Sequence, residues 1–174
     1  MNANDETEFW DVYDGDGNPT GRTIKRGDTL QNGEYHLVSS LMVVNNNGEI
    51  LIQKRSETKE INPGTWSITG GAARAGEKSE EACVREVYEE IGYVFDPGEI
   101  ELLYRYFHED NIFDDFIAIR DLDLNEAVLQ ADEVSELKWA NVDEIKKLYN
   151  SGQFMFGDIN LFDKTTAYIN DNLN

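Results

Sequence analysis

Residues 70–93 place the tightest limit on how this chain can fold. Two glycines, which permit a tight backbone, and a short polar turn lead into Ser79–Ile91 (SEEACVREVYEEI), whose apolar residues recur at the helical period. Ser79 is a suitable N-cap residue, and Gly92 stands where helices commonly end in a left-handed glycine. The segment therefore predicts a permissive glycine pair followed by a helix with a defined start and end.

The expected helix has two contrasting sides at about 100° per residue. Its apolar stripe consists of Val84, Val87, Tyr88 and Ile91. Its acidic side consists of Glu86, Glu89 and Glu90. Like charges three and four residues apart on a helix repel one another, and a hard divalent cation such as Mg²⁺, which binds oxygen ligands, would relieve that repulsion. A solvated acidic helix face in an acidic protein is the alternative that these three residues leave open.

A wider pattern from Gly71 to Tyr93 fixes more than the helix. Gly71 and Glu77 precede the sequence REVYEEIG at set spacings, a coincidence of seven residue types that ordinary composition gives about once in ten million. The pattern resembles the Nudix box, here residues 71–93. It departs at Tyr93, where the family usually has an aliphatic residue, and we expect an altered helix exit there. Further segments resemble a bacterial Nudix subgroup related to isopentenyl diphosphate isomerases. These segments are Glu8–Tyr13, Gly33–Leu37, Gln53–Ser56 and Asn62–Trp66.

The resemblance implies the fold class α/β (α+β), as a Nudix-type α/β/α sandwich with a mixed central sheet. We expect one domain over residues 1–174, in which residues 1–32 form an N-terminal β arm or hairpin. Apolar and β-branched runs predict strands, and Asn47-Gly48 predicts a tight turn that joins two of them in a hairpin. The expected strands are 9–13, 35–44, 50–53, 66–69, 102–107, 113–119 and 136–140. Two further helices are expected at 142–149 and 159–170.

The resemblance also implies the chemistry: hydrolysis of a nucleoside diphosphate linked to another moiety, with Mg²⁺ as cofactor and Mn²⁺ as the alternative. It assigns the metal ligands residue by residue. These are Glu86, Glu89, Glu90 and the backbone carbonyl of Gly70. Metal ions that bridge a diphosphate neutralise charge that grows in the transition state, which agrees with an all-oxygen ligand set.

Further roles follow from the resemblance. Arg85 is expected to pair with Glu77 and hold the loop against the helix. The base near the attacking water is Glu90 or Glu86, with Glu133 as a further candidate among competing late acids. The competing acids are Asp110, Asp114, Asp115 and Asp132. Three residues are expected to bind substrate, although charge balance or a structural role would also explain them. These are Arg55, Arg74 and His36.

The net charge limits the classes of partner that the chain can bind, and the cysteine content bears on its location. With 15 Lys and Arg against 35 Asp and Glu, the net charge of −20 repels nucleic acid and anionic membranes. We therefore expect a small-molecule nucleoside diphosphate derivative as the partner, no nucleic acid and no membrane. The single cysteine, Cys83, excludes an intramolecular disulfide, which fits a reducing compartment. The sequence has no apolar run of membrane-spanning length, so the expected location is the cytoplasm. The resemblance also allows a homodimer.

Two other functions compete with hydrolysis. A Nudix-like domain can bind a nucleotide without cleaving it, although loss of the box glutamates is the usual mark of such a module. An isopentenyl diphosphate isomerase, by resemblance, would need a cysteine in the strand that here reads Trp66-Ser67-Ile68-Thr69. The only thiol is that of Cys83, in the predicted helix near its packed side.

Overall fold

A computed structural model describes residues 8–155, 158 and 160–173 of the chain. The first strands are β1 (Phe9–Tyr13), β2 (Pro19–Lys25), β3 (His36–Val44), β4 (Ile50–Arg55), β5 (Trp66–Ser67) and β6 (Thr69–Ala72). The later strands are β7 (Glu101–His108), β8 (Asn111–Ile119) and β9 (Val134–Ala140). The helices are α1 (Ser79–Ile91), α2 (Val142–Asn150) and α3 (Asn160–Leu173), with 3-10 turns η1 (Pro97–Glu99) and η2 (Leu124–Glu126).

Strand β3 lies at the centre of a mixed sheet. It runs parallel to β8 over its whole length and antiparallel to β6, while β7 extends the sheet beyond β8. Strand β4 carries β5 and β9 as antiparallel partners and meets β3 only at the pair Val44–Ile50. The tight turn expected at Asn47-Gly48 is present, with Gly48 at φ 75°. The expected hairpin is present but short, because β3 and β4 pair antiparallel next to the turn and then separate to pair with other strands.

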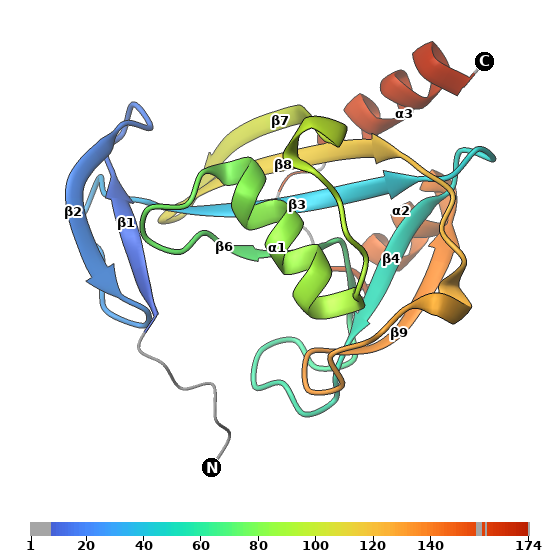
Figure 1. The fold of residues 1–174 in the computed structure, drawn as a ribbon, viewed down its shortest axis with the longest axis horizontal. Helices are drawn as coiled ribbons and strands as arrows, with labels where there is room; N and C mark the ends of the chain where they lie inside the picture. The colour runs from blue at the N-terminus through green and yellow to red at the C-terminus, as the bar shows by residue number, and fades with distance from the viewer. Residues whose placement is uncertain (1–7, 156–157, 159, 174) are drawn as a thin grey trace.

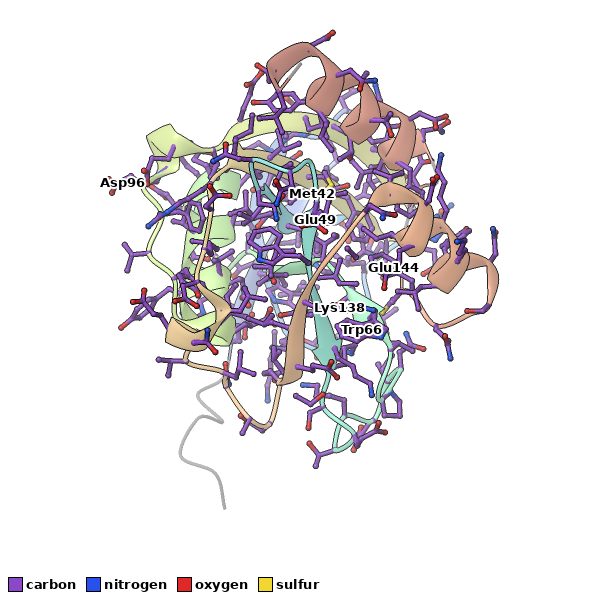
Figure 2. The ribbon with its side chains drawn as sticks, turned by 90° about the vertical axis from the view of Figure 1, so that its right-hand side faces the viewer. Met42, Glu49, Trp66, Asp96, Lys138 and Glu144 are labelled. Carbon is purple, nitrogen blue, oxygen red and sulfur yellow. The ribbon has the colours of Figure 1, made fainter. Side chains whose placement is uncertain are left out.

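Helices cover both faces of this sheet, as Figures 1 and 2 show. Alternate residues of β3 point to opposite faces, so Leu41 and Val43 pack with α1, whereas Met42 and Val44 pack with α2 and α3. The predicted α/β/α sandwich with a mixed sheet is confirmed. No helix of the described residues is long and apolar enough to cross a bilayer.

Lys138 of β9 ties the sheet to α2 on that second face. Its ammonium lies 4.4 Å from the ring centroid of Trp66 on β5 and 2.8 Å from a carboxylate oxygen of Glu144 on α2. Figure 2 shows the three labelled residues side by side. A cation between an aromatic face and a carboxylate links three elements at the end of the sheet.

The expected N-terminal hairpin is present as β1 and β2, which form a separate two-stranded sheet (Figure 1). Its connection to the body runs through a ring stack of Trp10 on His36, with centroids 4.0 Å apart. The backbone N–H of Gly76 also donates to Asp11 at 2.7 Å. The hairpin is therefore attached both to β3 and to the loop that precedes α1.

Helix α1 differs from its predicted form at two places. Its N-cap is Lys78 rather than Ser79, and the Lys78 backbone N–H donates to the Glu81 carboxylate at 3.0 Å. Tyr88, expected in the apolar stripe, is 58% exposed, whereas Glu90, expected on the outer side, is only 6% exposed. The sheet contacts Ala82, a residue outside the predicted stripe, so the buried side of the helix is rotated away from Tyr88.

The remaining elements follow the predictions with shifted ends. The expected strand 66–69 is two short strands, and Gly70 and Gly71, expected as a tight, permissive backbone, are paired with β3 inside β6. Helix α2 begins after Asn141, whose side chain accepts from the Glu144 backbone N–H at 2.9 Å. Helix α3 extends to Leu173, and residue 159, where it was expected to begin, lies outside the described residues.

Candidate active site

Arg85 organises the loop between β6 and α1. Its Nε and Nη2 donate to the two carboxylate oxygens of Glu77 at 2.7 and 2.9 Å, the expected pair. Its Nη1 donates to Glu86 at 2.7 Å and to Glu89 at 3.0 Å, and Nη2 also reaches the Ala72 carbonyl at 3.2 Å. Burial alone would lower the pKa of the guanidinium. The hydrogen bonds that Arg85 donates to Glu77 and Glu86, and the negative charges of these two residues, outweigh that effect and raise the pKa. Arg85 thus fixes two acidic side chains of α1 and the preceding loop together.

Glu90 is the most deeply buried of the three glutamates of α1. Its carboxylate accepts from Gln53 Nε2 at 2.8 Å, and the Gln53 amide oxygen accepts from Thr69 at 3.2 Å. Burial raises the pKa of Glu90 to about 8, and the nearby charges of Glu86 and Glu133 add to the effect. In the absence of a cation this carboxyl group therefore holds its proton near neutral pH.

Glu86 and Glu89 lie nearer the surface. Burial raises the pKa of Glu86, while its ion pair with Arg85 acts in the opposite direction. Arg74 Nη2 lies 3.2 Å from both carboxylate oxygens of Glu89, so that acid sits between two guanidinium groups. The acidic side of α1 is thus partly neutralised by arginines rather than simply solvated.

Gly70 and Gly71 pass under these carboxylates without side chains. A Cβ on Gly71 would lie 2.6 Å from the carboxylate carbon of Glu86, and one on Gly70 would lie 2.2 Å from the Ser39 carbonyl oxygen. Neither glycine has a positive φ, so close approach of neighbouring atoms is what excludes a side chain. The glycine pair therefore leaves the space that the Glu86 carboxylate and the Ser39 carbonyl occupy.

A cleft of about 570 Å³ opens over α1, β6 and the loops before β5 and β9. Seven of the predicted site residues line it: Gly70, Glu86, Glu89, Glu90, Glu133, Arg55 and Arg74. The others that line it are Glu8, Arg26, Lys59, Gly71, Ala72, Gln130 and Asp132. Lys59 donates to Glu133 at 2.6 Å across the cleft, so acids and bases from distant segments meet there.

Other predicted residues lie outside the cleft. Arg85 and Glu77 are not among the described residues that line it, and they support it from behind. His36 does not line it either: it is buried under Trp10, and burial lowers the pKa of its imidazole. Of the acids that compete with Glu133, only Asp132 shares the cleft. The competitors outside it are Asp110, Asp114 and Asp115.

The donor set fits a hard divalent cation. Glu86, Glu89, Glu90 and the Gly70 carbonyl offer only oxygen, and burial raises the pKa values of both Glu86 and Glu90. Within the described residues, no group of three His, Cys, Asp or Glu side chains is already arranged around a common metal position. Arg85, Arg74 and Gln53 hold the three carboxylates apart, so binding a cation requires these side chains to turn.

Several cleft residues had no role in the sequence analysis. Lys59 and Glu8 line the cleft and Gln53 donates to Glu90 beside it; the three come from separate segments, and nothing in their spacing to the box indicates that they meet it. For Gln53 one signal was present, because a buried polar residue ends the apolar run 50–52 of β4. For Lys59 and Glu8 the sequence holds no comparable signal.

The fold and this cleft define a class of proteins with a glutamate-rich helix beside a glycine pair on a sandwich sheet. The NUDIX domain family model matches residues 34–156, and the chain belongs to the Nudix family. An uncharacterized Nudix hydrolase of Listeria monocytogenes is 35% identical over 149 residues, covering 85% of this chain and 88% of the relative. The family and this relative support assignment as a hydrolase.

Other relatives carry a different activity in their names. An isopentenyl-diphosphate Delta-isomerase of Photorhabdus laumondii is 32% identical over 139 residues, covering 77% of each chain. Among solved structures, DR0079 from Deinococcus radiodurans matches with a TM-score of 0.76 at 21% identity, over 91% of this chain and 99% of that one. At that identity the likeness shows the fold alone.

Proposed function

We propose that the chain is an Mg²⁺-dependent pyrophosphohydrolase, with Mn²⁺ as the alternative cofactor, that cleaves a nucleoside diphosphate linked to another moiety. The observation that carries this proposal is the cleft itself. It joins the three glutamates of α1 to Glu133 and to basic side chains on the facing loops. Carboxylate side chains bind cations, and positively charged side chains bind phosphate oxygens. The cleft therefore has groups for both parts of a metal–diphosphate complex.

The cation would be held by Glu86, Glu89, Glu90 and the Gly70 carbonyl, where it would offset phosphate charge and make water a better nucleophile. Arg55 and Lys59 line the same cleft and supply positive charge for phosphate oxygens. In the cation-free cleft Arg85 holds Glu86 and Glu89 by contacts of 2.7 and 3.0 Å, and it would turn aside as the cation takes its place. These residues position the scissile P–O–P link, which water breaks to give two phosphate-bearing products.

Glu133 is the best placed general base. It faces the cleft from the loop before β9, and its side chain remains 29% exposed, so water can reach it. Glu90 is buried and hydrogen-bonded to Gln53, and as a cation ligand it would have its oxygens engaged. When phosphate draws Lys59 away, the Glu133 carboxylate becomes free to take a proton from the attacking water.

Isomerase activity is the second candidate, because relatives bear that name. Ser67 stands on β5 in the strand that would need the cysteine. Cys83, the single cysteine of the sequence, is fully buried in α1, and burial raises the pKa of its thiol. A thiol in that environment does not exchange protons with a substrate in the cleft, which favours hydrolysis.

The test is turnover of a panel of nucleotide and isoprenoid diphosphates with Mg²⁺, with EDTA, and with Glu89→Gln and Glu90→Gln variants. We expect cation-dependent cleavage of at least one nucleotide, with kcat reduced at least 100-fold in each variant. Glu126→Gln, on the η2 turn outside the cleft, is the matched control and should retain full activity. Binding without turnover would support a nucleotide sensor instead, and double-bond migration in isopentenyl diphosphate would support the isomerase.

A further inference from the structure

Arg74 carries a guanidinium group that has a single side-chain partner in the catalytic cleft. It stands in the loop between β6 and α1 and lines the cleft. Its Nη2 lies 3.2 Å from each carboxylate oxygen of Glu89, and its side chain has no other hydrogen-bond partner among the described residues. The Arg74 side chain is 46% exposed, so it has room to leave Glu89.

The backbone around Arg74 is fixed, unlike its side chain. The Arg74 backbone N–H donates to the Glu77 carboxylate at 2.8 Å. The next N–H, that of Ala75, donates to the Phe9 carbonyl of the N-terminal hairpin at 2.8 Å. These bonds do not involve the guanidinium, so the loop stays beside α1 whether or not Arg74 contacts Glu89.

Arg85, the other guanidinium on Glu89, is held more firmly. Its Nε and Nη2 are bound to the two carboxylate oxygens of Glu77, and its side chain is only 16% exposed. The contacts with Glu86 and Glu89 are made by Nη1. Arg85 can therefore turn Nη1 aside for a cation while it remains bound to Glu77, whereas Arg74 can leave Glu89 completely.

Arg74 and a divalent cation compete for the same carboxylate, because Glu89 is among the ligands assigned to the cation. A positive charge fixed beside the site also repels the cation. A diphosphate changes this balance, since its oxygens offer the guanidinium a new partner in the same cleft. Release of Arg74 from Glu89 would favour the cation, and arrival of phosphate would favour that release.

We propose that Arg74 is an internal counter-ion of Glu89 that gives way to the cation and passes to the diphosphate, so that cation and diphosphate bind cooperatively. The inference rests on the hydrolase function proposed above and concerns the regulation of the same site. Without a diphosphate, Arg74 weakens cation binding; with one, it contacts a phosphate group. Because coupling between two ligands is reciprocal, each should bind more tightly in the presence of the other.

A purely structural role for the contact between Arg74 and Glu89 predicts the opposite result. If the contact only held the loop against α1, its removal would loosen the site and weaken cation binding. The two side chains are 46% and 37% exposed, and ion pairs of that exposure contribute little to stability. The loop also has the backbone bonds described above. We therefore expect removal of the Arg74 guanidinium to raise the affinity for the cation.

Binding of Mn²⁺ tests the proposal without any turnover. Electron paramagnetic resonance counts free Mn²⁺ during titration of the wild type, Arg74→Met and Arg74→Lys. We expect Arg74→Met to bind Mn²⁺ about fivefold more tightly, since an ion pair of this exposure contributes at most about that factor, and Arg74→Lys to stay within about twofold of the wild type. Arg26→Met is the matched control, because it removes an arginine that lines the same cleft but pairs with Glu8 at 3.0 Å. Its Mn²⁺ affinity should stay close to that of the wild type.

Two further titrations separate the counter-ion from a general effect of charge. In a Glu89→Gln background, Arg74→Met should give no gain in Mn²⁺ affinity, because the carboxylate through which Arg74 acts is gone. Inorganic phosphate at millimolar concentration should tighten Mn²⁺ binding more in the wild type than in Arg74→Met. A residue that only supports the loop would not change this response to phosphate.

Unchanged or weaker Mn²⁺ binding in Arg74→Met would overturn the proposal, as would an equal gain in Arg26→Met, a gain that persists in Glu89→Gln, or an equal effect of phosphate on both proteins. Hydrolysis is scored separately with the panel of diphosphates. Tighter Mn²⁺ binding in Arg74→Met without cleavage of any diphosphate would support the counter-ion and refute the hydrolase. Cleavage by the wild type, with the same Mn²⁺ affinity in Arg74→Met, would do the reverse.

Discussion

Replacing Gly71 by Ala should reduce activity while leaving the fold nearly as stable as before. The new Cβ would lie 2.6 Å from the carboxylate carbon and from one carboxylate oxygen of Glu86, whereas ordinary contacts lie at 3.4–4 Å. The Glu86 carboxylate must therefore move by about 1 Å. A shift of that size in a catalytic group reduces rates by about 100-fold.

The effect on stability is small because the clashing atoms are at the end of a flexible side chain. Turning Glu86 to a less favoured rotamer costs about 1 kcal/mol, and Gly→Ala regains a similar amount by restricting the unfolded chain. The free energy of unfolding should therefore change by about 1 kcal/mol or less, as measured by urea denaturation.

Two further glycines serve as controls for Gly71→Ala. Gly70→Ala meets the Ser39 backbone oxygen at 2.2 Å and should lower stability through the β3–β6 pairing, whereas Gly98 has nothing within 4 Å and its Ala variant should behave as wild type. Steady-state kinetics with a cleaved diphosphate gives kcat for each variant. Full activity in Gly71→Ala would refute the idea that the placement of Glu86 controls catalysis.

Three other predictions concern charged side chains. Arg85→Met leaves the partly buried Glu77 and Glu86 carboxylates without their cation and should lower the free energy of unfolding by about 3 kcal/mol, while Arg85→Lys should recover part of it; urea titrations of the three proteins decide this. For Asp115, the folded pKa of about 7 exceeds the ordinary 3.8, so its contribution to stability is fully present below about pH 4 and is lost as pH rises towards and beyond 7, by roughly 4 kcal/mol as an upper bound. Asp115→Asn should remove that decline in pH-dependent denaturation curves, and an unchanged decline would assign it to other groups. Lys59→Met should raise KM for a diphosphate about tenfold with under about 1 kcal/mol of destabilisation, because its ion pair with Glu133 is partly exposed; Lys59→Arg should retain the wild-type KM, and equal KM values for Met and Arg would contradict a phosphate contact.

The sequence predicts the local elements well because their signals are local. The helix Ser79–Ile91 and the turn at Gly48 are marked by periodicity and by glycines, and both are present. The long parallel pairing of β3 with β8, beside the short one with β4, depends on contacts far apart in the chain, which no local pattern encodes. The burial of Glu90 likewise depends on what α1 packs against.

The candidate site shows the same division. The box motif identifies Glu86, Glu89 and Glu90 together with Arg85 because their spacing is fixed within one segment. The partners that complete the cleft, such as Lys59, come from other loops and are brought there only by the fold.

Hydrolysis in ¹⁸O-labelled water tests the central claim most directly. The protein is freed of cations with EDTA, a nucleotide diphosphate from the panel is added, and products are weighed by mass spectrometry before and after Mg²⁺ is restored. The account predicts no turnover without the cation and, with it, one ¹⁸O atom in one of the two phosphate products. Turnover that persists in EDTA, or products without label, would contradict attack by water in a cation-dependent glutamate cleft.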